Sequence, residues 1–181
     1  MNGDKTMIKK ILYISVLSVL MLGLLTGCGK DGQDGGKDTG EDATVKQEVS
    51  NIDVAAQTIV DTLLTEGEFK EPLSAIDNNM ALTRLYMLDA TMIEDAVFYT
   101  SSGATAEEIA VIKVNDTSYI DTVKSAFDTR IADQKSAFTD YVPEEVPKLD
   151  DAVIYTNGNY AILCVSSNSS KIDEAIAAIF Q

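Results

Sequence analysis

The chain of 181 residues carries 29 acidic and 14 basic side chains, which gives a formal net charge of −15 at pH 7. A chain this acidic excludes nucleic acid as a partner, because binding a phosphate backbone requires clustered lysine and arginine. Histidine is absent, so serine–histidine catalysis and histidine-ligated metal sites are excluded as well. We find no residue spacing typical of a catalytic centre, a metal site or a cofactor, and we expect none of these.

Residues 1–27 are typical of a lipoprotein signal peptide. Lys5, Lys9 and Lys10 give a positive start, and 15 uncharged residues follow from position 11 to position 25. As a helix this run would span roughly 22 Å, at about 1.5 Å per residue, whereas a bilayer core is about 30 Å thick. The run therefore favours a cleaved signal over a permanent membrane-spanning helix.

The signal ends in Leu25-Thr26-Gly27-Cys28, which resembles the lipobox of bacterial lipoproteins. The motif predicts that a peptidase cleaves before Cys28 and that the Cys28 thiol carries a diacylglycerol. Cys28 is thus the expected lipidation site, and the lipid bilayer is the expected partner. Because two or three acyl chains anchor a protein stably, we expect the chain at the extracytoplasmic face of the cell membrane. The alternative is an ordinary secretory cleavage site with a chance cysteine.

Residues 28–50 predict the lipidated cysteine followed by a flexible, acidic, glycine-rich tether. The 22 residues after Cys28 contain five glycines and six acidic side chains, and no aromatic residue. Such a segment buries too little apolar surface to offset the entropy that folding costs. A calcium-binding loop is the alternative for so many aspartates. Its spacing does not fit, because Asp31, Gln33 and Gly35 would occupy three ligand positions.

Residues 51–181 predict a single α+β globular domain, which is long enough to bury a core. Apolar and β-branched patterns indicate helices and strands, with an extended linker at 141–149 and a type I′ hairpin turn at Asn157-Gly158. The alternative for residues 105–108 is a capping box that opens a helix, and the alternative for residues 79–88 is two short turns. The expected helices are 51–64, 79–88, 117–138 and 169–180, and the expected strands are 95–100, 108–114, 151–156 and 159–166.

An internal echo indicates that the domain contains two ββα units. The six residues from Asp95 match the six from Asp151 at five positions, and the helix starts at Ser118 and Ser170 match at three positions of four. The alternative is coincidence among common strand and cap residues. The repeat predicts an antiparallel four-stranded sheet with pseudo-twofold symmetry, preceded by N-terminal helices, with both later helices on one face. The two expected units are residues 95–139 and 151–181.

The connection between the first two strands is longer than a hairpin requires, and such loops are often functional. It supplies hydroxyl groups, a glycine backbone and two carboxylates, so it is the candidate binding loop. The alternative is a surface turn with a bulge. Glu144-Glu145 is a second carboxylate pair, Arg130 and Asp133 are expected to form an ion pair within one helix, and Cys164 is expected to be a buried hydrophobe. The candidate binding residues are Ser101, Ser102, Gly103, Thr105, Glu107 and Glu108.

Four features together resemble a family of small lipoproteins from Gram-positive anaerobes that carry a domain of unknown function. They are the lipobox, the acidic tether, "YTSSGATAEEIAVIKV" and "YVPEEVPKLDDAVIYTNGNYAILCVS". The resemblance covers residues 52–180. It implies a surface lipoprotein with an α+β domain of this size, and it carries no activity, cofactor or catalytic residue.

The leading hypothesis is a membrane-anchored extracytoplasmic lipoprotein that acts as a non-enzymatic binding or assembly module, with an envelope protein as its partner. The first alternative is a cell-envelope enzyme using carboxylates, serine or lysine, with residues 101–108 at its site. It predicts that Glu107 or Glu108 approaches a hydroxyl group or Lys113. The second alternative is a small solute receptor for a transporter, which ranks last because one domain of this length lacks two lobes that could close on a solute.

Overall fold

The structure is a computed structural model that describes residues 52–181. The predicted signal peptide, the lipidation site Cys28 and the tether lie outside the described residues. Within residues 52–181 no helix has the length and apolarity needed to cross a bilayer. The helices are α1 (Ala56–Glu66), α2 (Asn78–Met80), α3 (Ile120–Tyr141), α4 (Val146–Asp150) and α5 (Ser169–Ile179), and the strands are β1 (Ser74–Ala75), β2 (Ile93–Thr100), β3 (Glu108–Val114), β4 (Val153–Asn157) and β5 (Tyr160–Val165).

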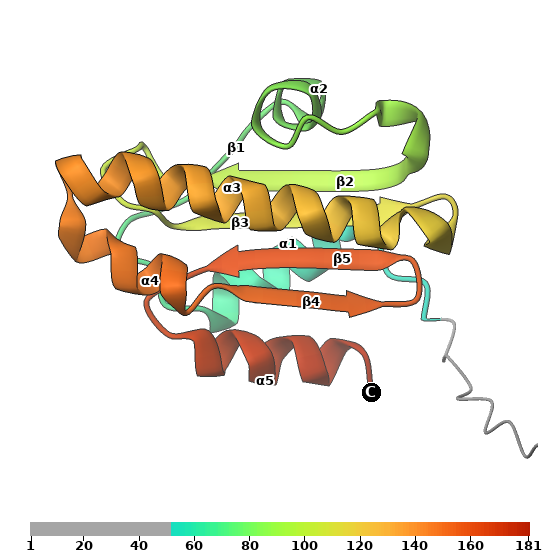
Figure 1. Cartoon of the computed structure of the whole chain (residues 1–181). Helices are drawn as coiled ribbons and strands as arrows, with labels where there is room; N and C mark the ends of the chain where they lie inside the picture. The colour runs from blue at the N-terminus through green and yellow to red at the C-terminus, as the bar shows by residue number, and fades with distance from the viewer. Residues whose placement is uncertain (1–51) are drawn as a thin grey trace, which may run out of the picture. The chain divides into compact units, whose positions relative to one another are not determined.

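The strands form one antiparallel sheet in the order β1-β2-β3-β5-β4, with helices around it (Figure 1). The α+β class and the antiparallel sheet are confirmed, and β3 has the predicted bounds. The predicted number of four strands is one too few. Sequence patterns miss β1 because it has only two residues, both exposed, which pair with Tyr99 and Thr100 at the end of β2.

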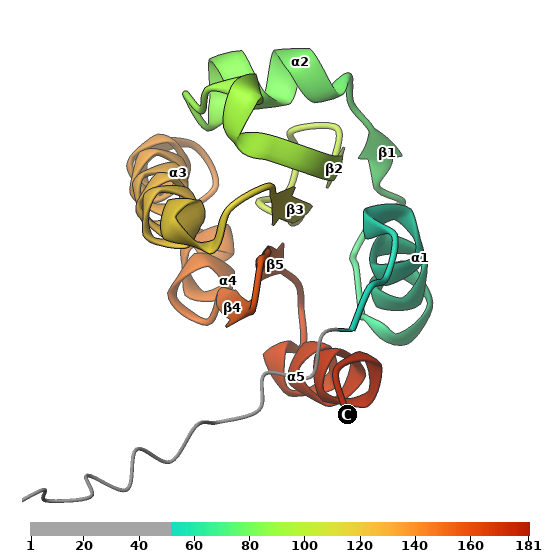
Figure 2. The ribbon, with the colours of Figure 1, turned by 90° about the vertical axis from the view of Figure 1, so that its right-hand side faces the viewer.

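Helices cover both faces of the sheet, so the expectation of both later helices on one face is wrong (Figure 2). On one face, Val123 and Phe127 of α3 pack in a core with strand residues such as Ile112. On the other face, α1 and α5 pack over strand residues such as Ile109 and Ile162. The reason lies in β3 and β5, which are buried almost throughout and therefore require cover on both sides.

The four long strands are paired as a twofold axis perpendicular to the sheet would pair them. Tyr99 lies opposite Ile109 in the first hairpin, and the echoed Tyr155 lies opposite Ile162 in the second. The antiparallel pairing of β3 with β5 obeys the same twofold relation. Such an axis would keep both helices on one face, so whole ββα units are not related by it. Whether the echo records a duplication stays a prediction.

The connection before β4 is helical where an extended linker was predicted. A 3₁₀ turn (Pro143–Glu145) leads directly into α4. Pro147 lies in the first turn of α4, where its missing N–H leaves no helical hydrogen bond unmade. The two prolines therefore begin short helical turns.

The β4–β5 turn lies one residue later than predicted. Asn157 pairs with Tyr160, so the two connecting residues are Gly158 and Asn159. Gly158 has φ of +56°, and Met87 is the only non-glycine with positive φ in residues 52–181. A positive φ at the first connecting residue alone is the pattern of a type II′ turn, and the predicted type I′ turn is wrong.

The predicted helix at 79–88 is broken into α2 and a π-helical turn (Ala81–Leu85). The segment closes with the N–H of Leu88 donating to the Leu82 carbonyl at 2.8 Å. This closure places Met87 at φ of +52°, in the left-handed region, with 82% of its surface exposed. That conformation is costly for a residue with a Cβ, by about 1–2 kcal/mol.

We therefore expect Met87→Gly to raise the free energy of unfolding by about 1 kcal/mol, because glycine adopts positive φ without strain. Urea unfolding followed by circular dichroism measures the change. The matched control is Met80→Gly, at helical φ of −62° and ψ of −46°, which should lower stability by about 1 kcal/mol. A loss of stability in both variants would show that the Met87 side chain contributes more than its backbone strain costs.

Candidate functional site

An open cleft of about 550 Å³ lies between the β2–β3 loop, the segment around α2 and the C-terminal half of α3. Its apolar wall includes Ile76, Leu85 and Phe138, and its rim includes the exposed side chains of Met80 and Tyr141. The structure brings every predicted binding residue to this cleft: Ser101, Ser102, Gly103, Thr105, Glu107 and Glu108.

The loop is closed by its own hydrogen bonds. The Ser101 hydroxyl donates to the Thr105 carbonyl at 2.6 Å, and the Ser101 N–H donates to the Glu107 carbonyl at 3.0 Å. Gly103 has φ of +97°, and a Cβ there would meet no atom within 4 Å. Glycine is therefore required for the backbone conformation, and steric room for a side chain is present. The Ser102 hydroxyl donates to Glu71 at 3.0 Å, which ties the loop to the segment before β1.

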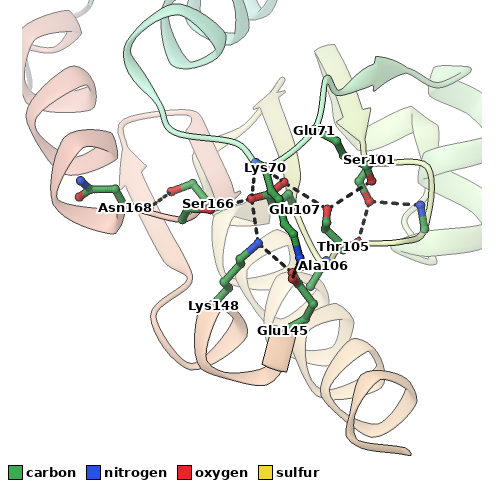
Figure 3. A network of polar contacts seen from close by, with 12 residues as sticks. Lys70, Glu71, Ser101, Thr105, Ala106, Glu107, Glu145, Lys148, Ser166 and Asn168 are labelled. Carbon is green, nitrogen blue, oxygen red and sulfur yellow. Dashed lines mark hydrogen bonds and ion pairs between the residues drawn. The ribbon is translucent and has the colours of Figure 1, made fainter. Parts of the chain in front are cut away.

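The Glu107 carboxylate is the centre of a buried polar network (Figure 3). It accepts hydrogen bonds from the Lys70 backbone N–H at 2.9 Å, the Lys148 ammonium at 2.9 Å, and the hydroxyls of Ser167 at 2.9 Å and Thr105 at 3.1 Å. These donors come from four separate segments of the chain. Glu107 therefore holds together the loop, α4 and the connections around them.

Glu145 also belongs to this network, whereas Glu144, its neighbour in the predicted carboxylate pair, does not. The Lys148 ammonium also lies 2.9 Å from the Glu145 carboxylate, which accepts the Ala106 N–H at 3.1 Å. Glu145 is buried, whereas the adjacent Glu144 is exposed. The half-buried Lys148 thus pairs with two buried carboxylates, the Lys70 ammonium lies 3.5 Å from Glu145, and Glu144 takes no part.

Electrostatics keep all three groups charged. Burial alone would raise the pKa of Glu107, but the Lys70 N–H, Lys148 and Ser167 outweigh burial, and the pKa is lowered. Burial likewise opposes ionisation of Glu145, and Lys148 with the Ala106 N–H lowers its pKa. Burial disfavours the Lys148 ammonium, but both carboxylates raise its pKa. The network is therefore ionised at neutral pH.

Glu108 forms a second buried network on the α3 side of the sheet. Its carboxylate accepts hydrogen bonds from Arg130, with Nη2 at 2.7 Å and Nε at 3.1 Å, and from the Tyr86 hydroxyl and the Gln134 amide. Burial disfavours the Arg130 cation, but Glu108 raises its pKa. The predicted Arg130–Asp133 ion pair is wrong, because Arg130 is bound to Glu108.

The structure separates the other groups that the enzyme alternative needs. Lys113 lies at the far end of β3, where it pairs with Asp53 at 2.9 Å and Glu94 at 2.6 Å. The hydroxyl contact that this alternative predicts is present, because Glu107 accepts hydrogen bonds from Thr105 and Ser167, and the predicted contact with Lys113 is not made. Cys164 is buried as predicted, and burial raises the pKa of its thiol, so the thiolate is disfavoured.

Sequence reasoning missed the two lysines of the Glu107 network. The Glu145–Lys148 contact has a local signal, because residues three apart on a helix face each other. The Lys70–Glu107 contact joins positions 37 residues apart and has no local signal.

Lys148→Met tests the network, and we expect it to lower the free energy of unfolding at pH 7 by about 3–5 kcal/mol, because Glu107 loses its cation and Glu145 keeps only the exposed Lys70 ammonium at 3.5 Å. The wild-type carboxyl pKa values are lowered by folding, so wild-type stability falls as pH drops through them. In the variant, burial without Lys148 raises those pKa values. Its stability should therefore increase from pH 7 to pH 5, as urea unfolding at each pH would reveal.

The control is Lys135→Met, which removes a more exposed ion pair with Asp150 at 2.8 Å. Such a pair contributes about 0–1 kcal/mol, and its removal should leave the pH dependence as in the wild type. If Lys148→Met and Lys135→Met behaved alike, the network would not carry the stability assigned to it.

The family model described as a domain of unknown function, DUF4358, matches residues 65–166, which is more than half of the chain. The match runs from the last turn of α1 to the residue after β5, and it includes the cleft loop, Glu145 and Lys148. No curated protein matches the chain, and no solved structure matches it.

Proposed function

Because the chain belongs to the DUF4358 family, whose description assigns no activity, we propose a function from its residues and geometry. The protein is a lipid-anchored binding module at the extracytoplasmic face of the cell membrane, and an envelope protein is its partner. The anchor rests on the sequence from the signal peptide to Cys28. The binding role rests on the cleft beside residues 101–108.

The observation that carries this proposal is the position of the cleft relative to the start of the domain. Asp53 pairs with Lys113 near the end of β3, and the Val54 N–H donates to the Tyr160 hydroxyl at 2.9 Å. Glu108, which lines the cleft, is the first residue of β3. At about 3.4 Å per residue these points are roughly 17 Å apart along the strand. A tether would join the domain at the end of the sheet opposite the cleft.

This arrangement favours presentation of the cleft away from the membrane. Figure 1 has the C-terminal end of α3 and the β2–β3 connection at one end of the sheet, and the β4–β5 turn at the other. A partner could therefore reach the cleft without displacing the lipid anchor.

Binding is favoured over catalysis because the two glutamates at the cleft, Glu107 and Glu108, are engaged. Glu107 and Glu108 each hold a cation and several hydrogen-bond donors. A general acid or base needs a proton that it can exchange with a ligand, and these groups are held in structural contacts. The groups left to a ligand are apolar side chains, hydroxyls at the rim and the exposed carboxylate of Asp133. The enzyme alternative has in its favour the contacts of Glu107 with the hydroxyls of Thr105 and Ser167, but those contacts belong to the buried network, and no observation favours the solute receptor.

Cys28→Ser tests the anchor. We expect cells fed radiolabelled palmitate to label the wild-type chain, and we expect the label to be lost in this variant, because only the Cys28 thiol would carry the diacylglycerol. Mass spectrometry of the wild type should find a mature N-terminus at Cys28. Cys164→Ser is the matched control, since it changes the other cysteine of the chain, and it should keep the label. An unlabelled wild type, or a labelled Cys28→Ser variant, would contradict the anchor.

A photocrosslinking amino acid at Tyr141 tests the cleft on intact cells. We expect one discrete adduct with an envelope protein, because Tyr141 is 78% exposed at the cleft rim. The same amino acid at the exposed Asp173 of α5 is the control. Met80→Glu should reduce the Tyr141 adduct about tenfold, as expected for loss of an apolar contact. Equal adducts from both positions, or no adduct at Tyr141, would contradict a partner at this cleft.

A further inference from the structure

The cleft continues into a groove along α3. A second cavity, of about 270 Å³, lies between residues 85–88 and the N-terminal half of α3. Leu85 and Asp133 line both cavities. The α3 residues that line them extend from Thr122 to Tyr141, which is roughly 28 Å of helix at about 1.5 Å per residue. A groove of this length suits a peptide segment better than a compact small molecule.

Exposed apolar side chains gather at this groove. Within residues 52–181, three large apolar residues are exposed: Met80 at 46%, Met87 at 82% and Tyr141 at 78%. All three line one of the two cavities. Met87 is also the residue with strained, positive φ. Strain and apolar exposure at the same residue favour a contact with a partner, and methionine adapts readily to such contacts.

The charge that lines the groove outside the buried networks is negative. The charged residues that line the two cavities are Glu107, Glu108, Arg130 and Asp133. The first three are engaged in the buried networks, whereas Asp133 is exposed and forms no salt bridge within residues 52–181. Arg84 lines neither cavity. A lysine or arginine is therefore the complement to the centre of the groove, and the acidic domain attracts it at long range.

We propose that this groove binds a peptide segment of the envelope partner, in which apolar side chains flank a lysine or arginine. The apolar side chains fill the two cavities, and the basic side chain pairs with Asp133. This inference rests on the proposed function and names the chemistry of the partner at that site. An anionic lipid surface is the less favoured occupant, because Asp133 and the acidic domain would repel it.

The test is selection of a phage-displayed library of random twelve-residue peptides on the full chain, purified from membranes in mild detergent. The selected sequences should share apolar residues on both sides of a lysine or arginine. Affinity for a selected peptide, measured by fluorescence anisotropy, should fall at least tenfold in Asp133→Lys. It should recover when the basic residue of the peptide is changed to glutamate.

Two further variants separate binding from folding and from general charge attraction. Asp128→Lys makes the same charge change on an exposed residue of α3 that lines neither cavity, and it should change affinity less than twofold. Met87→Gly is expected to stabilise the fold, yet it should weaken the peptide several-fold. Equal losses in Asp133→Lys and Asp128→Lys, or selected peptides that lack a basic residue, would overturn the proposal.

The outcomes also distinguish this inference from the proposed function. If no peptide is selected but the Tyr141 adduct forms on cells and is reduced by Met80→Glu, the peptide chemistry is wrong and the binding module stands. If neither result is obtained, both fail.

Discussion

The contact between Glu107 and Lys148 is the interaction on which the rest of the site depends. Glu107 is buried and Lys148 is half-buried, and their contact joins the end of the β2–β3 loop to α4. Removing charged groups from water is costly, so this pair is stable only because Glu145, the Lys70 N–H and two hydroxyls satisfy the remaining positions. No buried side-chain nitrogen or oxygen lacks a hydrogen-bond partner in residues 52–181. The cleft wall is therefore held in place before any ligand arrives.

Adjacent acidic residues have separate roles because of strand geometry. Successive side chains along a strand point to opposite faces. Glu107, directly before β3, consequently meets Lys148, while Glu108, the first residue of β3, meets Arg130 of α3. The two adjacent glutamates therefore belong to separate networks, and each network fixes a different wall of the cleft. This division explains why a loop rich in functional groups favours binding over acid–base chemistry.

The sequence predicts the elements better than their arrangement. The bounds of β3 and the helix at the C-terminus follow from local patterns, and the long loop correctly draws attention to the cleft. The sequence also indicates that helices cover both faces of the sheet. The continuous apolar run from Ile109 to Ile112 is typical of a strand that is buried on both sides. The ion networks could not be predicted, because the cations that pair with Glu108 and Glu107 are 22 and 41 residues away in the sequence. Local periodicity carries no information on such contacts.

The position of α5 has a consequence for the opposite face of the sheet. Five strands about 4.8 Å apart make a sheet roughly 19 Å wide, whereas a helix with its side chains is about 10 Å across. Two helices, α1 and α5, together span one face, but α3 is the only long helix on the other. There the broken segment after β1 covers the remaining width, and short turns cannot seal the seam beside α3. If α5 had followed the twofold relation of the strands, it would share the α3 face and close that seam. By packing on the far side, α5 leaves room for one more segment of chain that residues 52–181 do not supply.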